Sequence, residues 1–178
     1  MKRKLLACMF LLVLIGCQQA PTWKEFESAQ GGFAVLMPGT PTEQRRTAKT
    51  ASGSIDAHMF VVDHGDVAYM VAYSDYPNTM VQERTPKLIL DGARDGAVAN
   101  AKGRLLNESS VSMNGHPGRE VHVEPVGGKV TITARIFLVG RRLYQVMVLM
   151  PKEKASSKDV NKFLDSFRIQ PQPPQPKG

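Results

Sequence analysis

Residues 129–150 read KVTITARIFLVGRRLYQVMVLM, and this stretch decides the fold. Residues 129–139 alternate with a period of two, which places five apolar side chains on one face of a strand: Val130, Ile132, Ala134, Ile136 and Leu138. The side chains between them are polar at first and apolar from Phe137 onward. A glycine turn at 140–142 leads into a second strand over 143–150. The pattern predicts an antiparallel sheet covered on one face along its length and on both faces at one end.

Short runs of strand-forming residues precede this hairpin, and turn residues bound each of them. They are residues 33–37, 55–63, 67–74, 105–113 and 119–124. Residues 42–52 are polar and basic, so we expect a loop or an exposed edge there. Trp23 and Phe26 are spaced i and i+3 and are expected to cap one end of the core, with insertion into a bilayer interface as the alternative.

A helix is predicted from Pro86 to about Asn100. Thr85 is a suitable N-cap, and proline is well tolerated at the first helical position. Gly92 and Gly96 each weaken the helix by about 1 kcal/mol relative to alanine. Together with the neighbouring alanines they would make a smooth surface, which we expect to lie close on the sheet.

A second helix is predicted to begin at Ser156, with Asp159 completing a weak capping box. Its apolar residues fall at i, i+3, i+4 and i+7: Val160, Phe163, Leu164 and Phe167. This is the clearest amphipathic pattern in the chain and predicts a helix with its aromatic face on the sheet. A helix that binds a partner is the alternative interpretation. Arg168-Ile169 is expected to add a short terminal strand.

These elements predict one α+β domain over residues 23–170, in which an antiparallel β-sheet is flanked by helices. The length of 178 residues fits a single domain with a sizeable core. Residues 171–178 are rich in proline and glutamine and are expected to be a disordered tail.

The N-terminus has the features of an export signal. A basic segment at 2–4 is followed by an apolar run over 5–15, which is shorter than the roughly 20 residues that a membrane-spanning helix needs. Leu14-Ile15-Gly16-Cys17 resembles the lipobox of bacterial lipoproteins. We therefore expect residues 1–16 to be a cleaved lipoprotein signal peptide and Cys17 to carry the lipid. An ordinary signal peptide with a chance cysteine is the alternative.

The anchor leads to expectations about location. Residues 17–22 would form a lipidated tether that reaches roughly 20 Å when extended. Gln18 follows the cysteine, where an aspartate tends to retain enterobacterial lipoproteins at the inner membrane. The expected location is therefore outside the cytoplasm, at the periplasmic face of an outer membrane rather than at the inner membrane.

The net charge of the chain is +7, but three of the basic residues lie in the predicted signal, which leaves +4 on the mature chain. Nucleic acid is not expected as a partner of an exported, membrane-tethered domain. Two basic pairs, Arg45-Arg46 and Arg141-Arg142, are candidates for contacts with lipid head groups or glycan phosphates. Solvated loop tips are the alternative interpretation of these pairs.

The search for catalytic motifs returns no candidate. Of the two cysteines, Cys8 leaves with the signal and Cys17 is blocked by lipid, so no disulfide, thiolate metal site or thiol nucleophile is expected. Asp56 and His58 share a strand face, but the histidines lack the spacing of metal ligands. We predict no catalytic residue, no bound metal and no cofactor.

Several segments together resemble secreted bacterial domains of PsbP-like fold. They are Trp23-x-x-Phe26-x-Ser28-x-x-Gly31-Gly32-Phe33-x-Val35-x-Met37-Pro38-Gly39-x-Pro41, Leu90-Asp91-Gly92-Ala93-Arg94-Asp95-Gly96, Gly115-x-Pro117-Gly118-Arg119-Glu120, Arg142-Leu143-Tyr144-Gln145-Val146 and Phe163-Leu164-x-Ser166-Phe167. The resemblance implies an α/β/α sandwich. Relatives of this fold include an extrinsic photosystem II subunit and a Ran-binding nuclear protein, which implies an accessory or binding role and not catalysis. The lipobox lies outside the family pattern.

The function that we expect is therefore a lipid-anchored accessory or binding protein of the cell envelope, with an unidentified protein or envelope component as its partner. The alternative is a hydrolase that acts on envelope material through residues assembled only by folding. A pocket that holds two or more of His58, His122, Asp56 and Asp75 would favour the hydrolase. A shallow surface with an exposed apolar patch would favour binding.

Overall fold

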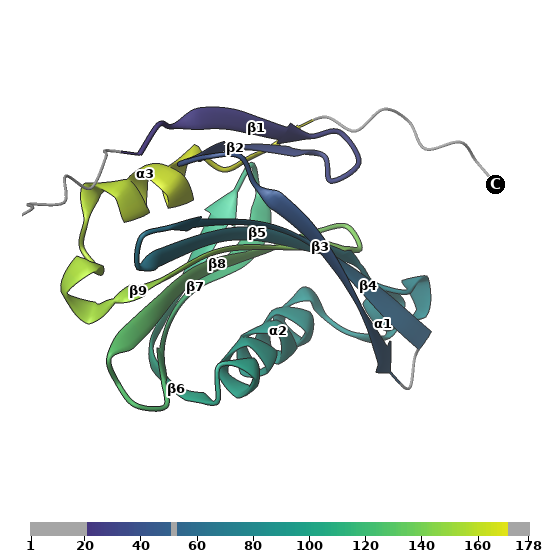
Figure 1. The fold of residues 1–178 in the computed structure, drawn as a ribbon. Coiled ribbons are helices and arrows are strands. Elements are labelled where there is room, and N and C mark those ends of the chain that lie inside the picture. The colour runs from purple at the N-terminus through teal and green to yellow at the C-terminus, as the bar shows by residue number, and fades with distance from the viewer. Residues whose placement is uncertain (1–20, 51–52, 171–178) are drawn as a thin grey trace, which may run out of the picture.

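The computed structural model describes residues 21–50 and 53–170. Its main element is a sheet of seven strands in the order β3-β4-β5-β9-β8-β7-β6, in which every neighbouring pair is antiparallel (Figure 1). The strands are β3 (Thr42–Thr50), β4 (Gly53–His64), β5 (Val67–Asp75), β6 (Gly103–Met113), β7 (His116–Pro125), β8 (Val130–Val139) and β9 (Arg142–Pro151). The stretch that decides the fold forms β8 and β9, with Leu138 opposite Leu143 next to the turn.

Different layers cover the two faces of this sheet (Figure 1). One face packs against α3 (Lys158–Ser166) and a three-stranded sheet of β1 (Lys24–Ser28), β2 (Phe33–Met37) and β10 (Arg168–Ile169). The other face packs against α2 (Pro86–Asn100). A short α1 (Asn78–Glu83) precedes α2, and a 3₁₀ turn, η1 (Lys152–Lys154), precedes α3.

Two hydrophobic clusters fill the spaces between these layers. The cluster under α3 contains Phe33, Tyr144 and Phe163, each at most 1% exposed. The cluster under α2 is smaller and contains Ile89, Leu90 and Ile136. Every side chain of both clusters lies between Trp23 and Ile169. Within the described residues, both clusters therefore lie inside a single segment of the chain.

The burial of β8 follows the predicted pattern only in part. Phe137 belongs to one cluster and Leu138 to the other, so both faces are covered at that end of the strand, as predicted. The polar residues of its first half are not solvent-facing, because Thr131 and Thr133 are 6% and 5% exposed. The Thr131 hydroxyl donates to the carbonyl of Val123 at 3.3 Å, which satisfies it within the sheet.

Both main helices exist, with corrections in detail. Thr85 caps α2, and its hydroxyl accepts from the amide of Leu88. The prediction that Gly92 and Gly96 lie close on the sheet is wrong, since a Cβ at either position would meet nothing within 4 Å. The cap of α3 is Ser157 and not Ser156. All four predicted apolar residues of this segment are buried: Val160, Phe163, Leu164 and Phe167.

The basic stretch expected as a loop or exposed edge is an edge strand, β3, so the second of these alternatives is confirmed. The strand β1 and the helix α1 were not predicted. The predicted signal peptide, Cys17 and the tail over 171–178 lie outside the described residues. None of the helices within the described ranges is long and apolar enough to span a bilayer.

Candidate functional site

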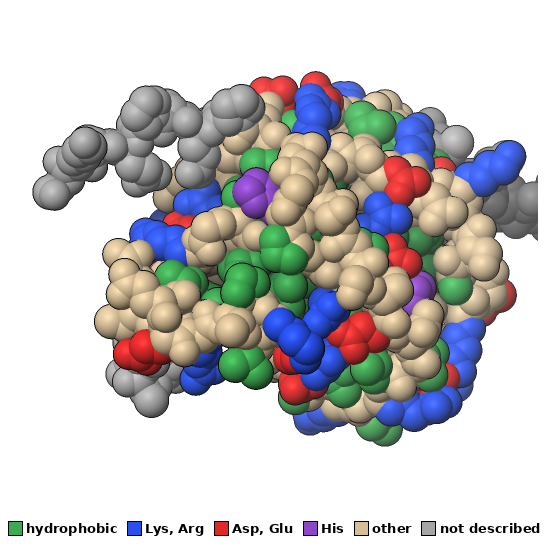
Figure 2. All heavy atoms as spheres, turned by 180° about the vertical axis from the view of Figure 1, so that it is seen from behind, with side chains coloured by type: hydrophobic (Ala, Val, Ile, Leu, Met, Phe, Trp, Pro, Cys, Tyr) green, Lys and Arg blue, Asp and Glu red, His purple; other side chains and the backbone are tan. Residues whose placement is uncertain are grey.

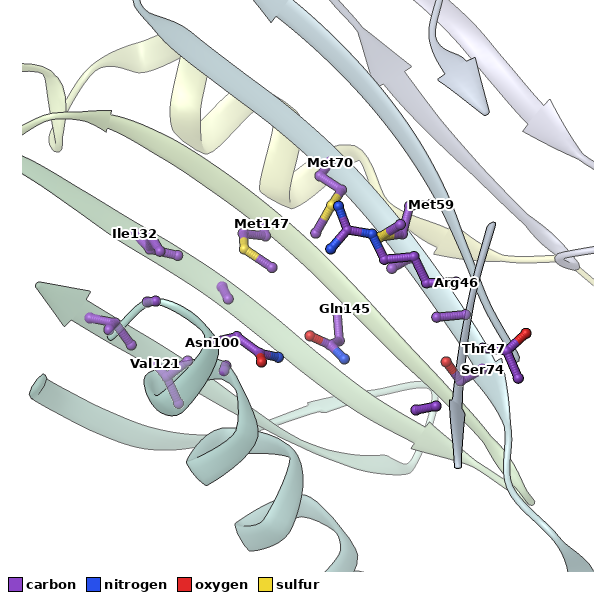
Figure 3. Close-up of a pocket in the computed structure, with 17 residues that line it drawn as sticks. Arg46, Thr47, Met59, Met70, Ser74, Asn100, Val121, Ile132, Gln145 and Met147 are labelled. Atoms are coloured by element: carbon purple, nitrogen blue, oxygen red, sulfur yellow. The ribbon is translucent and has the colours of Figure 1, made fainter. Parts of the chain in front are cut away.

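The face of the main sheet that carries α2 is only half covered. The helix packs on β6, β7 and β8, at one end of the strand order. Beyond it, the inner face of β9, β5 and β4 borders a cavity of about 600 Å³ (Figure 3). We call this cavity the methionine groove. It is lined by Arg46, Thr47, Ala48, Ala57, Met59, Met70, Ala72, Ser74, Ala97, Asn100, Ala101, Val121, Val123, Ile132, Ala134, Gln145 and Met147.

The strand register builds the floor of the methionine groove. Met70 of β5 pairs with Met147 of β9, Met147 pairs with Ala134 of β8, and Ala134 pairs with Val121 of β7. These four side chains point to the same face, because residues opposite each other in a sheet share a face. Met59 of β4 lies one strand further out (Figure 3). With neighbouring strands about 4.8 Å apart, the five strands give a floor about 19 Å long.

The exposure of the floor changes along this row. Ala134 and Val121 are 1% and 0% exposed, because they lie near α2. The three methionines are only half-buried, since no helix covers them. Methionine is unbranched and polarisable, so it adapts to apolar partners of varied shape. A row of half-buried methionines beside a closed apolar floor can bind an apolar group.

Arg46 is the one charged side chain that lines the groove, and no carboxylate lines it. Its guanidinium group extends from β3 over the floor toward Met70 (Figure 3). It forms no ion pair with any residue in the part of the chain that the structure describes. The remaining polar groups of the lining are uncharged hydroxyls and amides, among them Ser74, Gln145 and Asn100.

The other predicted contact residues have different surroundings. Arg45 points to the opposite face of β3 and pairs with Glu43 at 3.2 Å. Arg141 is exposed at the turn between β8 and β9. Arg142 is not a surface contact, because its side chain is 11% exposed and both oxygens of the Asp75 carboxylate accept from it, at 2.7 and 2.6 Å.

None of the four residues that would mark a hydrolase lines the groove. Strand alternation places His58, His122, Asp56 and Asp75 on the opposite face from the groove residues next to them in sequence. The ring of His58 stacks on Tyr73 with 4.7 Å between the centroids. Asp56 accepts a hydrogen bond from Thr47 at 2.7 Å. Within the described residues, no three His, Cys, Asp or Glu side chains come together as a metal site.

The charged groups beside α2 neutralise one another. Asp91 on the helix pairs with Arg119 of β7 at 3.1 Å, and Arg94 pairs with Glu108 of β6 at 2.9 Å. Hydrogen bonds from Lys87 and then from Arg119 hold the pKa of Asp91 below its ordinary value. This network attaches the helix to the sheet and leaves no unbalanced charge for a ligand. Basic and acidic side chains also lie intermixed on the face seen in Figure 2.

Comparison with solved structures identifies the architecture. The chain matches the solution structure of cyanobacterial PsbP (CyanoP) from Synechocystis sp. PCC 6803 with a TM-score of 0.58 and 14% identity, covering 86% of this chain and 95% of that chain. The chain has a PsbP-like fold. A crystal structure from Bacteroides thetaiotaomicron VPI-5482 matches with a TM-score of 0.44 and 12% identity, covering 83% of this chain and 48% of that one. No protein-family model and no curated protein matches the chain.

The PsbP-like fold confirms the fold predicted from the sequence, but the methionine groove was not predicted. Its methionines belong to three strands, so no local motif joins them. The available signal was that Met59, Met70 and Met147 occupy positions of apolar strands where β-branched residues are more usual. The sequence could not show where α2 packs, and therefore could not show that these three methionine side chains lie beyond it.

Proposed function

We propose that this chain is a lipid-anchored accessory or binding protein of the bacterial cell envelope and that it binds through the methionine groove. The observation that supports the proposal is an apolar cavity of about 600 Å³ on a half-covered sheet face. Ligand sites in proteins have this size and combine an apolar lining with a few polar groups. The PsbP-like fold is compatible with such a role but does not by itself indicate a ligand.

The lining favours binding over hydrolysis. A general base must lie within hydrogen-bonding reach of the proton that it removes. The groove is lined by no histidine and no carboxylate, and His58, His122, Asp56 and Asp75 point away on the far side of the sheet. An envelope hydrolase would have to use a different surface from the cavity described here.

The anchor belongs to the same proposal. A lipid on Cys17 and a short tether over 17–22 would hold the domain close to a membrane, at the periplasmic face of an outer membrane. Two or more acyl chains make such attachment stable, since each buried methylene contributes about 0.8 kcal/mol. The partner would then be a component of the envelope, and nucleic acid would not meet the protein.

The anchor can be tested with the two cysteines of the chain. We expect Cys17→Ser to abolish incorporation of labelled palmitate and to move the protein from the membrane to the soluble fraction. The matched control is Cys8→Ser, which changes the same residue type within the predicted signal and should leave labelling intact. Palmitate labelling of the Cys17→Ser chain would contradict the proposed anchor.

The groove can be tested by filling it from α2. Ala97 lines the groove, whereas Ala99 is exposed on the same turn of the helix and does not line it. We expect the full chain to bind the neutral apolar dye N-phenyl-1-naphthylamine with a rise in its fluorescence. Ala97→Trp should abolish this rise and Ala99→Trp should preserve it, with equal thermal unfolding as evidence that both variants fold. Equal dye binding by the two variants would contradict the groove as the binding site.

A further inference from the structure

We infer that the ligand of the methionine groove is a single-chain amphiphile with an anionic head group, whose apolar chain lies along the methionines and whose head group binds Arg46. This inference rests on the proposed function and specifies the chemical class of the ligand. It follows from the length of the apolar floor, the volume of the cavity and the charge at its edge.

The dimensions of the groove fit one acyl chain. The floor from Met59 to Val121 crosses five strands and is about 19 Å long. One leaflet of a bilayer's hydrocarbon core, which is the depth that an acyl chain occupies, is about 15 Å. Such a chain would contact the half-buried Met59, Met70 and Met147 in turn, because Ala134 and Val121 are at most 1% exposed and form the closed end of the floor.

The size of the cavity favours a small ligand over a protein partner. A stable interface between proteins buries about 800 Å² on each side, and an α-helix with its side chains is about 10–12 Å wide. The cavity measures about 600 Å³ and is bounded on one side by α2 through Ala97, Asn100 and Ala101. That space is in the range of small-molecule sites.

Arg46 determines the charge of the head group. Seven other described arginines pair with a carboxylate, which neutralises them: Arg45, Arg94, Arg104, Arg119, Arg135, Arg142 and Arg168. Arg46 has no such partner among the described residues and extends over the apolar floor (Figure 3). Its planar guanidinium donates two parallel hydrogen bonds to a carboxylate or phosphate. An amphiphile with a cationic head would be repelled at the same position.

The test compares two amphiphiles that have the same chain length and opposite charge. The full chain is loaded with N-phenyl-1-naphthylamine, and laurate or dodecyltrimethylammonium is added below its micelle concentration. We expect laurate to displace the dye at a concentration about tenfold lower, since attraction and repulsion at an exposed arginine add up to a difference of this order. Arg46→Gln should bring the ratio of the two concentrations close to one. The matched control Arg45→Gln removes a neighbouring positive charge from the other face and should preserve the ratio.

The outcomes separate this inference from the proposed function. Failure of the dye to bind contradicts the groove as a binding site. Dye binding with equal displacement by both amphiphiles, or a ratio that Arg46→Gln leaves unchanged, overturns the anionic head group and leaves the binding site in place. Dye that neither amphiphile displaces overturns the inference and makes a protein segment the occupant to pursue.

Discussion

Arg142 is a single residue that joins three parts of the molecule. Its guanidinium donates to both oxygens of Asp75 and to the backbone carbonyls of Gln30 and Gly31, at 2.9 and 3.0 Å. It also lies 4.7 Å above the ring of Tyr73, within the range of a cation–π contact. The side chain thereby attaches the turn between β1 and β2 to the end of the main sheet.

Removing this side chain should destabilise the fold. Arg142→Ala leaves Asp75 and the carbonyl of Gln30 without their donor, whereas the carbonyl of Gly31 keeps its bond from the Tyr144 hydroxyl. We expect the free energy of unfolding to fall by about 2–4 kcal/mol. The control Arg141→Ala removes the neighbouring arginine, which is exposed, and should change the free energy by less than about 0.5 kcal/mol. Urea denaturation measures both variants. Equal midpoints would show that Arg142 does not stabilise the fold.

The ion pair between Arg142 and Asp75 predicts that stability depends on pH. Hydrogen bonds from Arg142 lower the pKa of Asp75 below its ordinary value of 3.8. A carboxyl group with a lowered pKa in the folded state stabilises the protein above the unfolded pKa, and this contribution is lost as the pH falls through the folded pKa. We therefore expect Asp75→Asn to unfold more easily than wild type at pH 7, with a difference that shrinks below about pH 4. A difference that stays constant from pH 7 to pH 3 would contradict the ion pair.

At the scale of elements, α2 is stabilised by its contacts with the sheet more than by its sequence. Ile89 and Leu90 are the buried residues of the helix, and Gly92 and Gly96 face open space. Glycine inside a helix costs about 0.5–1 kcal/mol relative to alanine, because the unfolded chain loses more conformational freedom. The two glycines therefore weaken the helix without a packing benefit.

Gly92→Ala should raise the free energy of unfolding by about 0.5–1 kcal/mol. The opposite result is expected for Gly118→Ala in β7, because the new Cβ would lie 2.6 Å from the carbonyl oxygen of Ile136. Thermal unfolding compares the two variants with wild type. A loss of stability in Gly92→Ala would show that this helix surface has a contact that the structure does not contain.

At the scale of the whole molecule, one sheet separates the two hydrophobic clusters and both depend on it. Trp23 is the single tryptophan of the chain and packs edge-on against Tyr69, with 5.7 Å between the ring centroids. Tyr69 in turn contacts Phe163 of α3, with 5.3 Å between the centroids. The fluorescence of Trp23 therefore reports on the α3 side of the sheet.

A shared sheet predicts a single cooperative unfolding transition. The fluorescence of Trp23 and the far-UV circular dichroism of the whole chain should change at the same urea concentration. Phe163→Ala should lower the free energy of unfolding by about 3–5 kcal/mol and should move both signals together, because Phe163 is fully buried. Separate transitions would show that the α2 side of the sheet unfolds independently of the α3 side.

Local pattern was enough to predict most of the architecture. Alternation in β8 and β9 predicted the hairpin, and Val160, Phe163 and Leu164 predicted the buried face of α3, because periods of 2 and 3.6 residues depend only on neighbours in sequence. The choice between a loop and an exposed edge for the basic stretch stayed open in the sequence, because the polar and basic residues of β3 carry no burial pattern.

The residues of the candidate site depended on contacts that no local pattern contains. The sequence by itself determined the fold class, the strand and helix faces and an N-terminal segment with the features of a lipobox. It did not distinguish Arg46 at the groove from Arg142 in its ion pair, since both belong to similar basic pairs. The methionine groove exists because strand register aligns Met70 with Met147 and because α2 packs mainly on β6, β7 and β8. Register and helix placement arise from long-range packing, and only the tertiary structure decided them.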